Sequence, residues 1–104
     1  MTRSRRKLIE TLVGKGAVLS GDEPRADVLY RVNVYQESIL AGDQWLDGLK
    51  DASGSIHVVN GSFGLMDDNL YLRFEDKRRV RIFPRQQTSE SDWRIQCSGD
   101  WFTT

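Results

Sequence analysis

The chain of 104 residues has little of what disulfide-bonded, metal-binding and membrane-spanning proteins depend on. It contains one cysteine, one histidine and two prolines, and its fifteen basic residues are balanced by fifteen acidic ones. A lone Cys97 excludes an internal disulfide and is typical of a reducing compartment. Net neutrality excludes a global field that would draw the protein to nucleic acid or anionic lipid. Any electrostatic recognition must therefore be local.

Long apolar runs are also missing. No window approaches the roughly eighteen consecutive apolar residues of a membrane span. The basic start TRSRRK precedes a short apolar run, but Glu10 and Lys15 interrupt it and no small-residue cleavage site follows, which argues against a signal peptide. We therefore expect a soluble, cytoplasmic protein that does not engage a membrane.

What is present is enough to fold. Hydrophobic residues make up 38% of the chain, with three Trp, four Phe and three Tyr, which is more than a disordered chain of this size carries. A chain of this length supports one core. We expect a single domain over residues 1–104, with an N-terminal helical arm over 1–14 and a β-domain over 16–104.

The stretch from Asn69 to Arg85 organises the expected fold. Its apolar residues recur two apart on both sides of a charged turn: Leu70, Leu72, Phe74, Val80 and Ile82. Period two is typical of half-buried antiparallel strands. Keeping these residues on one face predicts Phe74 opposite Val80 and Leu72 opposite Ile82, with residues 76–78 as a three-residue loop.

The same register places like charges together on the outer face. It sets Arg73 across from Arg81, which destabilises a strand pair, and Glu75 across from Arg79, which relieves part of the repulsion.

The N-terminal region combines a predicted helix with a predicted hairpin. Arg5–Val13 has its apolar residues at the i, i+1, i+4, i+5 spacing of an amphipathic helix, and Gly14 is a plausible terminator. The turn formers Ser20–Pro24 predict a loop of about six residues before an alternating strand. The inward face of that strand is expected to hold Val28, Tyr30, Val32 and Val34.

Residues 39–54 are compatible with helix, strand or loop. In a helix, Asp43, Asp47 and Asp51 would line one face and suggest a cation site. Their spacing does not match the D-x-[DN]-x-[DN]-G loop that binds calcium, and Gly48 weakens a helix. A solvated loop or helical turn is the simpler interpretation, and no metal or cofactor is expected.

The rest of the chain adds further strands. Ser55–Asn60 alternates and ends in an Asn-Gly turn, and Trp93–Cys97 alternates after an exposed loop. Trp101 and Phe102 are expected to cover one end of the core. About six strands with regular turns predict an all-β antiparallel meander that closes into a small barrel or a curled two-layer sandwich. The predicted core is Val32, Val34, Leu72, Phe74, Val80, Ile82, Trp93 and Ile95.

No catalytic constellation is visible. His57 occupies a strand position typical of a rim residue, and Cys97 falls on the inward face, where a thiol acts as a small apolar filler. Neither a triad arrangement, a Gly-rich phosphate loop, a C-x-x-C pair nor an H-E-x-x-H motif occurs. We therefore expect a non-catalytic protein, and no specific motif indicates a family.

One surface combines arginines with aromatic rings. Alternation places on the outer face of the sheet the candidate ligand-binding residues Arg31, Tyr71, Arg73, Arg79, Arg81, Phe83 and Arg94. Small barrels that bind single-stranded nucleic acid combine a basic groove with such stacking platforms. A plain solvated sheet face uses the same residues, because their long side chains cover a pleated surface.

Two function hypotheses follow from the sequence. The first is an interaction or assembly module that docks another protein or a second copy of itself. The second is binding of single-stranded nucleic acid or another anionic ligand through the arginine and aromatic face.

Overall fold

The computed structural model describes residues 3–64, 67 and 69–103, and the side chains of these residues except Arg3 and residues 99–103. All regular structure in that part of the chain is β-strand. The six strands are β1 (Arg3–Ser20), β2 (Glu23–Ala41), β3 (Gln44–Gly61), β4 (Leu70–Arg73), β5 (Arg78–Gln87) and β6 (Asp92–Thr103). The predicted all-β fold of about six strands is confirmed.

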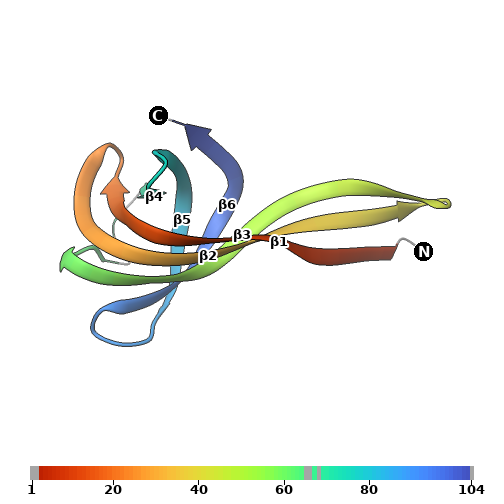
Figure 1. Ribbon diagram of the computed structural model, residues 1–104. Coiled ribbons are helices and arrows are strands. Elements are labelled where there is room, and N and C mark those ends of the chain that lie inside the picture. The colour runs from red at the N-terminus through yellow and green to blue at the C-terminus, as the bar shows by residue number, and fades with distance from the viewer. Residues whose placement is uncertain (1–2, 65–66, 68, 104) are drawn as a thin grey trace.

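The six strands close into an antiparallel barrel in the order β1-β2-β3-β6-β5-β4, with β4 pairing back to β1 (Figure 1). Strands β1–β3 form one meander and β4–β6 form a second. β3 pairs with β6, whereas β4 pairs with β1, so β4 begins at the opposite edge of the first meander from the one where β3 lies. Closure leaves no edge strand along the barrel itself.

The barrel interior is a single apolar cluster. All eight predicted core residues belong to it, and each is less than a tenth exposed. The inward face of β2 is also confirmed over Val28, Tyr30, Val32 and Val34. Tyr30 and Phe74 meet edge to face, with ring centroids 4.9 Å apart, which is a favoured aromatic geometry.

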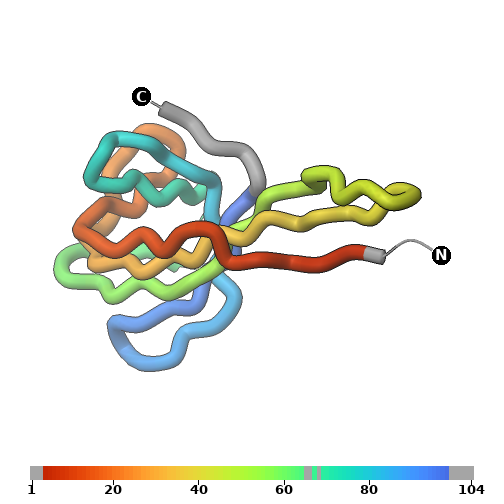
Figure 2. The backbone as a smooth tube through the Cα atoms, turned by 45° about the vertical axis from the view of Figure 1, so that its right-hand side comes forward, coloured from red at the N-terminus to blue at the C-terminus, as the bar shows by residue number. Residues whose placement is uncertain are grey.

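Strands β1, β2 and β3 continue well beyond the barrel. β1 pairs with β4 only over residues 17–20, and β3 pairs with β6 only over residues 52–57. The remainder, residues 3–9, 35–41 and 44–51, forms a three-stranded sheet, called here the β extension, that projects from one side of the barrel (Figures 1 and 2). It makes the molecule 50 × 29 × 23 Å, with a radius of gyration of 15.2 Å against about 13 Å for a compact domain of this length.

The predicted N-terminal helix is wrong, because residues 3–20 form β1. Strand β2 pairs with β1 along its whole length, and these backbone hydrogen bonds outweigh a weak local preference. A register shift between Leu8 and Glu10 leaves Ile9 as an extra residue. The bulge shifts the phase of the side-chain alternation there, so the apolar residues on either side resemble a helical pattern.

The faces of the β4–β5 hairpin are as predicted, but the register is wrong by two residues. Leu72 lies opposite Val80, and Arg73 lies opposite Arg79. The Phe74 N–H donates to the Arg78 carbonyl, which makes residues 75–77 the loop, and Lys77 occupies the left-handed position at φ 72°. Lys77 takes the position that the predicted loop gave to Arg78. A slip by two keeps every side chain on its face, so the hydrophobic pattern could not detect it.

The β1–β2 turn is shorter than predicted. Ser20 pairs with Glu23, so Gly21 and Asp22 alone form the turn, and Gly21 has the positive φ of 61° that such turns require. Pro24 lies in β2 opposite Leu19, beside a bulge where its missing N–H is tolerated.

Residues 39–54 are strand on both sides of a tight turn at Gly42–Asp43, so the expected solvated loop or helical turn is wrong. Asp47 and Asp51 lie on β3, which removes the row of carboxylates that a helix would have made. The pairing with β2 decides the conformation of this segment. The predicted role of Trp101 and Phe102 concerns side chains outside the described ones.

Two glycines allow the strands to curl into the barrel. A Cβ added at Gly54 would collide with the backbone carbonyl of Arg31, and one at Gly16 would collide with that of Arg73. Gly54 lies where β3 passes from the β extension into the barrel, and Gly16 lies near the pairing of β1 with β4. Glycine at such close approaches is typical of barrel corners.

Candidate functional site

The structure brings together five of the seven predicted site residues. Tyr71 lies opposite Arg81 and Arg73 opposite Arg79, so these four side chains share the outer face of β4 and β5. Phe83 continues this face along β5, where it lies opposite Gln96 of β6. This set is called here the arginine face.

Arg31 and Arg94 belong to a different part of the surface. Both lie opposite Ser55 of β3, one from β2 and the other from β6, and they form a row across those three strands. Neither is paired with β4 or with the residues of β5 that carry arginine. The five candidate arginines therefore do not converge on one point.

Most of these arginines keep their charge available. Arg79 is paired with Asp22 at 2.7 Å, and its guanidinium lies 5.2 Å from the Tyr71 ring centroid. The Arg81 guanidinium lies 5.3 Å from the centroid of Phe83. Within the described side chains, Arg31, Arg73, Arg81 and Arg94 make no ion pair with a carboxylate.

The two acidic residues of the hairpin turn point elsewhere. Asp76 accepts hydrogen bonds from the backbone N–H and the Nε of Arg78, and the backbone bond is the main cause of its lowered pKa. Glu75 reaches across to accept a hydrogen bond from the Lys15 backbone N–H at 2.9 Å. The predicted relief of Arg79 by Glu75 therefore does not occur, and Asp22 supplies that partner instead.

His57 is confirmed as an exposed residue of β3. Its Nδ1 lies 2.7 Å from an oxygen of Asp92, and Ser89 donates to the other oxygen at 2.6 Å. The hydrogen bond from Ser89, followed by that from His57, lowers the pKa of the Asp92 carboxyl. The carboxylate stands between the serine and the imidazole, so the imidazole is not placed to take a proton from the serine.

Cys97 is confirmed as a buried residue. It is 3% exposed, and burial raises the pKa of its thiol from 9.0 to about 12. A thiol held protonated in this way is a poor nucleophile. In the described part of the chain no group of three or more His, Cys, Asp or Glu side chains is placed to hold a metal ion, and no helix is long and apolar enough to cross a membrane.

The sequence did not reveal the β extension, which has two dissimilar faces. Cross-strand partners share a face. One face, called here the packing face, carries the apolar side chains Leu8, Tyr35, Ile39 and Leu46 together with Arg6, Glu37 and Asp51. The other, called here the basic face, carries the charged side chains Arg5, Lys7, Asp47 and Lys50 together with Leu40 and Trp45.

On each face of the β extension one arginine makes contacts across the strands, called here a clamp. On the packing face, Arg6 of β1 donates two hydrogen bonds to Asp51 of β3, at 3.1 and 2.7 Å. Its guanidinium passes over Tyr35 of the intervening strand β2, 3.8 Å from the ring centroid. On the basic face, Arg5 lies 4.1 Å from the Trp45 ring. On the packing face Leu8 and Leu46 remain exposed, at 50% and 51%, whereas Tyr35 and Ile39 are partly buried.

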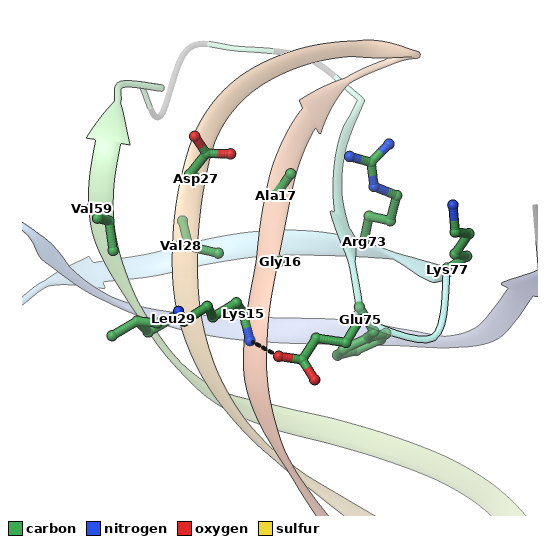
Figure 3. A pocket seen from close by; sticks show the side chains of 11 residues that line it. Lys15, Gly16, Ala17, Asp27, Val28, Leu29, Val59, Arg73, Glu75 and Lys77 are labelled. Atoms are coloured by element: carbon green, nitrogen blue, oxygen red, sulfur yellow. Dashed lines mark hydrogen bonds between the residues drawn. The ribbon is translucent and has the colours of Figure 1, made fainter.

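A groove of about 930 Å³ on the outside of the barrel was also missed (Figure 3). It crosses the outer side of β1, between β2 and β3 on one side and β4 with its turn on the other. Only Arg73 among its lining residues was predicted as a site residue. The small outward side chain of Ala17 was the available signal, because it leaves room between the neighbouring strands.

Comparison of the chain with protein-family models, with curated proteins and with solved structures found no match. Inference about function therefore rests on the geometry alone.

Proposed function

We propose that the protein is a non-catalytic, cytoplasmic assembly module whose β extension docks onto a second copy of the chain. The carrying observation is the β extension itself, a paired sheet that leaves apolar side chains exposed outside the barrel core. Exposed apolar patches rimmed by polar residues on a folded protein commonly mark sites of protein–protein interaction.

The charges favour contact between two packing faces. The packing face carries one basic and two acidic side chains, so a two-fold arrangement can place Arg6 of one copy near Glu37 of the other. The basic face carries Arg5, Lys7 and Lys50 against Asp47, so two copies would repel each other there.

Edge-to-edge pairing is less favourable. Strand β1 has a bulge at Ile9 and basic residues from Arg5 to Lys7, and β3 has an extra residue between Asp47 and Lys50 opposite Glu37. Bulges and like charges on an edge strand both oppose its pairing with a copy of itself.

The size of the β extension sets the expected strength. Three strands of seven or eight residues cover about 25 Å by 10–15 Å. Two such faces bury an area at the low end of specific interfaces, about 1,200 Å² in total or less. The association is therefore reversible, and its dissociation constant is in the micromolar range or weaker.

Sedimentation equilibrium between about 5 and 500 µM tests the proposal. The wild-type protein is expected to show concentration-dependent dimer formation. Leu46→Asp on the packing face is expected to leave only monomer, whereas Lys50→Asp on the basic face of the same strand keeps the dimer. A wild-type protein that stays monomeric throughout would contradict the proposal, and equal loss in both variants would show that the packing face is wrongly chosen.

A second candidate function is binding of single-stranded nucleic acid on the arginine face. Its support is that Arg73 and Arg81 make no ion pair with any carboxylate among the described side chains, while Phe83 remains 40% exposed beside Arg81. If about four phosphates are contacted, affinity falls roughly fifty-fold for a fourfold rise in salt.

Fluorescence anisotropy with a labelled oligonucleotide checks this candidate. Phe83→Ala is expected to weaken binding by about 1–3 kcal/mol without changing the salt dependence, because stacking carries no charge. Arg73→Glu with Arg81→Glu is expected to abolish binding while the fold is kept. Absence of measurable affinity at low salt would exclude this function and leave the assembly module.

A further inference from the structure

We infer that the groove over β1 is a binding site for a small organic anion with an aromatic or apolar body. The inference is independent of self-association, because the groove lies on the barrel and the packing face lies on the β extension. Its volume of about 930 Å³ is at the upper end of the range of small-molecule sites.

The floor of the groove exists because the outward side chain of β1 at its centre is only the methyl group of Ala17. Gly16 and Ala17 lie between Val28 of β2 and Arg73 of β4. Gly16 next to Ala17 faces the barrel interior, where a Cβ would collide with the Arg73 carbonyl and press on the Tyr30 ring, so β1 and β4 lie close together here. The two walls are therefore separated by about two strand spacings, or roughly 10 Å, which is wide enough for an aromatic ring system.

The wall from β2 and β3 is mainly apolar. Leu29 and Val59 project from it, and they are 42% and 61% exposed although both are large hydrophobic residues. Val59 is the extra residue of a bulge, since Asp27 pairs with Asn60 and Val28 with Val58. Bulges redirect side chains, and this one adds Val59 to the groove lining.

The opposite wall is positive. Arg73 and Lys77 stand on it, and Lys15 lies at the floor (Figure 3). Of the two carboxylates in the groove, Glu75 is engaged by the Lys15 backbone N–H, and Asp27 lies across Ala17 from Arg73 on the apolar wall. An anionic group is therefore attracted to Arg73 and repelled from Asp27.

Because one wall is apolar and the other is positive, a ligand with an apolar end and an anionic end would bind in one orientation. The apolar body of the ligand would lie against Leu29 and Val59, and its carboxylate, sulfonate or phosphate would meet the guanidinium of Arg73. Arginine suits this task because it presents several N–H donors in a plane and stays charged at all relevant pH values.

Two dyes of matched shape test the inference. Anilinonaphthalene sulfonate has an aromatic body and one anionic group, and N-phenyl-1-naphthylamine has the same ring system without the sulfonate. Fluorescence titration of the wild-type protein is expected to show saturable one-to-one binding of the sulfonate, at least about tenfold tighter than the uncharged dye. Equal affinities, or no saturable binding of the sulfonate, would overturn the inference.

Variants locate the site. Arg73→Gln is expected to weaken the sulfonate about tenfold and the uncharged dye less than about twofold. Val59→Ser, at an exposed position, is expected to weaken both dyes and leave the fold unchanged by circular dichroism. Arg94→Gln on the other side of the barrel and Leu46→Ser on the β extension are the controls, and both are expected to bind the sulfonate like the wild type. Loss of binding in either control, or none in Arg73→Gln, would place the dye elsewhere and overturn the inference.

Discussion

Strand β2 buries alternate side chains inside the barrel, from Ala26 to Val34, whereas residues 36–40 of the same strand are all partly exposed in the β extension. The hydrogen-bonded ladder is continuous across both regions. The difference lies in the second layer, because β4, β5 and β6 face only the barrel end of β2 across the interior. Backbone pairing alone therefore lengthens the sheet, but the side chains are buried only where a second layer of strands packs against it.

The two regions are consequently stabilised by different interactions. The barrel depends on the burial of residues such as Leu72 and Ile82, each at most 2% exposed. The β extension depends on cross-strand contacts such as Arg6 with Asp51 and Arg5 with Trp45. Exposed ion pairs contribute a fraction of a kcal/mol each, so the β extension is expected to open more easily than the barrel.

Removal of a core ring gives the largest expected effect. Phe74→Ala deletes the partner of Tyr30 and leaves a cavity, so the free energy of unfolding falls by about 3–5 kcal/mol. Urea denaturation measures the loss. Leu49→Ala in the β extension, where the side chain is 80% exposed, is the control and is expected to change stability by less than about 0.5 kcal/mol. Similar losses in both would show that the two regions share one core.

The buried thiol of Cys97 makes the stability of the barrel sensitive to alkaline pH. Burial raises its pKa from 9.0 to about 12, so its contribution is complete below pH 9 and is lost as the pH rises toward 12. The difference corresponds to a free energy on the order of 4 kcal/mol. Unfolding curves between pH 8 and 12 are expected to fall more steeply for the wild type than for Cys97→Ala. Parallel curves would show that the thiol does not titrate with unfolding.

The junction between the two regions is expected to be sensitive to a single methyl group. Gly54→Ala places a Cβ against the Arg31 carbonyl and is expected to cost about 1–3 kcal/mol through backbone displacement. Gly42→Asn at the tip of the β extension is the control, because Asn tolerates the positive φ of 66° and the space there is open. Thermal unfolding compares the two variants, and a neutral Gly54→Ala would show that the strands can separate at the junction.

The smallest expected effect concerns the Arg6 clamp. Arg6→Gln removes two hydrogen bonds and the contact with Tyr35, at a site where both charged partners are about half exposed. Global stability is expected to fall by less than about 1 kcal/mol. Amide hydrogen exchange of residues 35–39 is expected to accelerate, while exchange in the barrel stays unchanged. Lys7→Gln on the basic face should alter neither, and acceleration throughout the barrel would show that the two regions open together.

Periodicity located the barrel residues correctly because they alternate against one continuous core. Leu72, Phe74, Val80 and Ile82 were assigned inward from period two alone, and all four are buried. The pairing register was out of reach, since a slip by two preserves every face, and only the turn hydrogen bonds from Phe74 and Lys77 decide it. The same alternation predicted correctly that the arginines of β4 and β5 share one face. It could not show that Arg31 and Arg94 lie on another part of the surface, because that depends on the strand order.

The sequence by itself determined the all-β class, the inward faces and the buried thiol, because these follow from local alternation and from the need to remove apolar side chains from water. Only the tertiary structure decided that residues 3–14 and 44–54 are strands, because both segments lack a strict local pattern and take their conformation from pairing with β2. It also decided the groove over Ala17, which requires residues from β1, β2, β3 and the β4–β5 turn to meet. No short stretch of sequence can predict this groove, since its lining residues are brought together only by pairing between strands far apart in the chain.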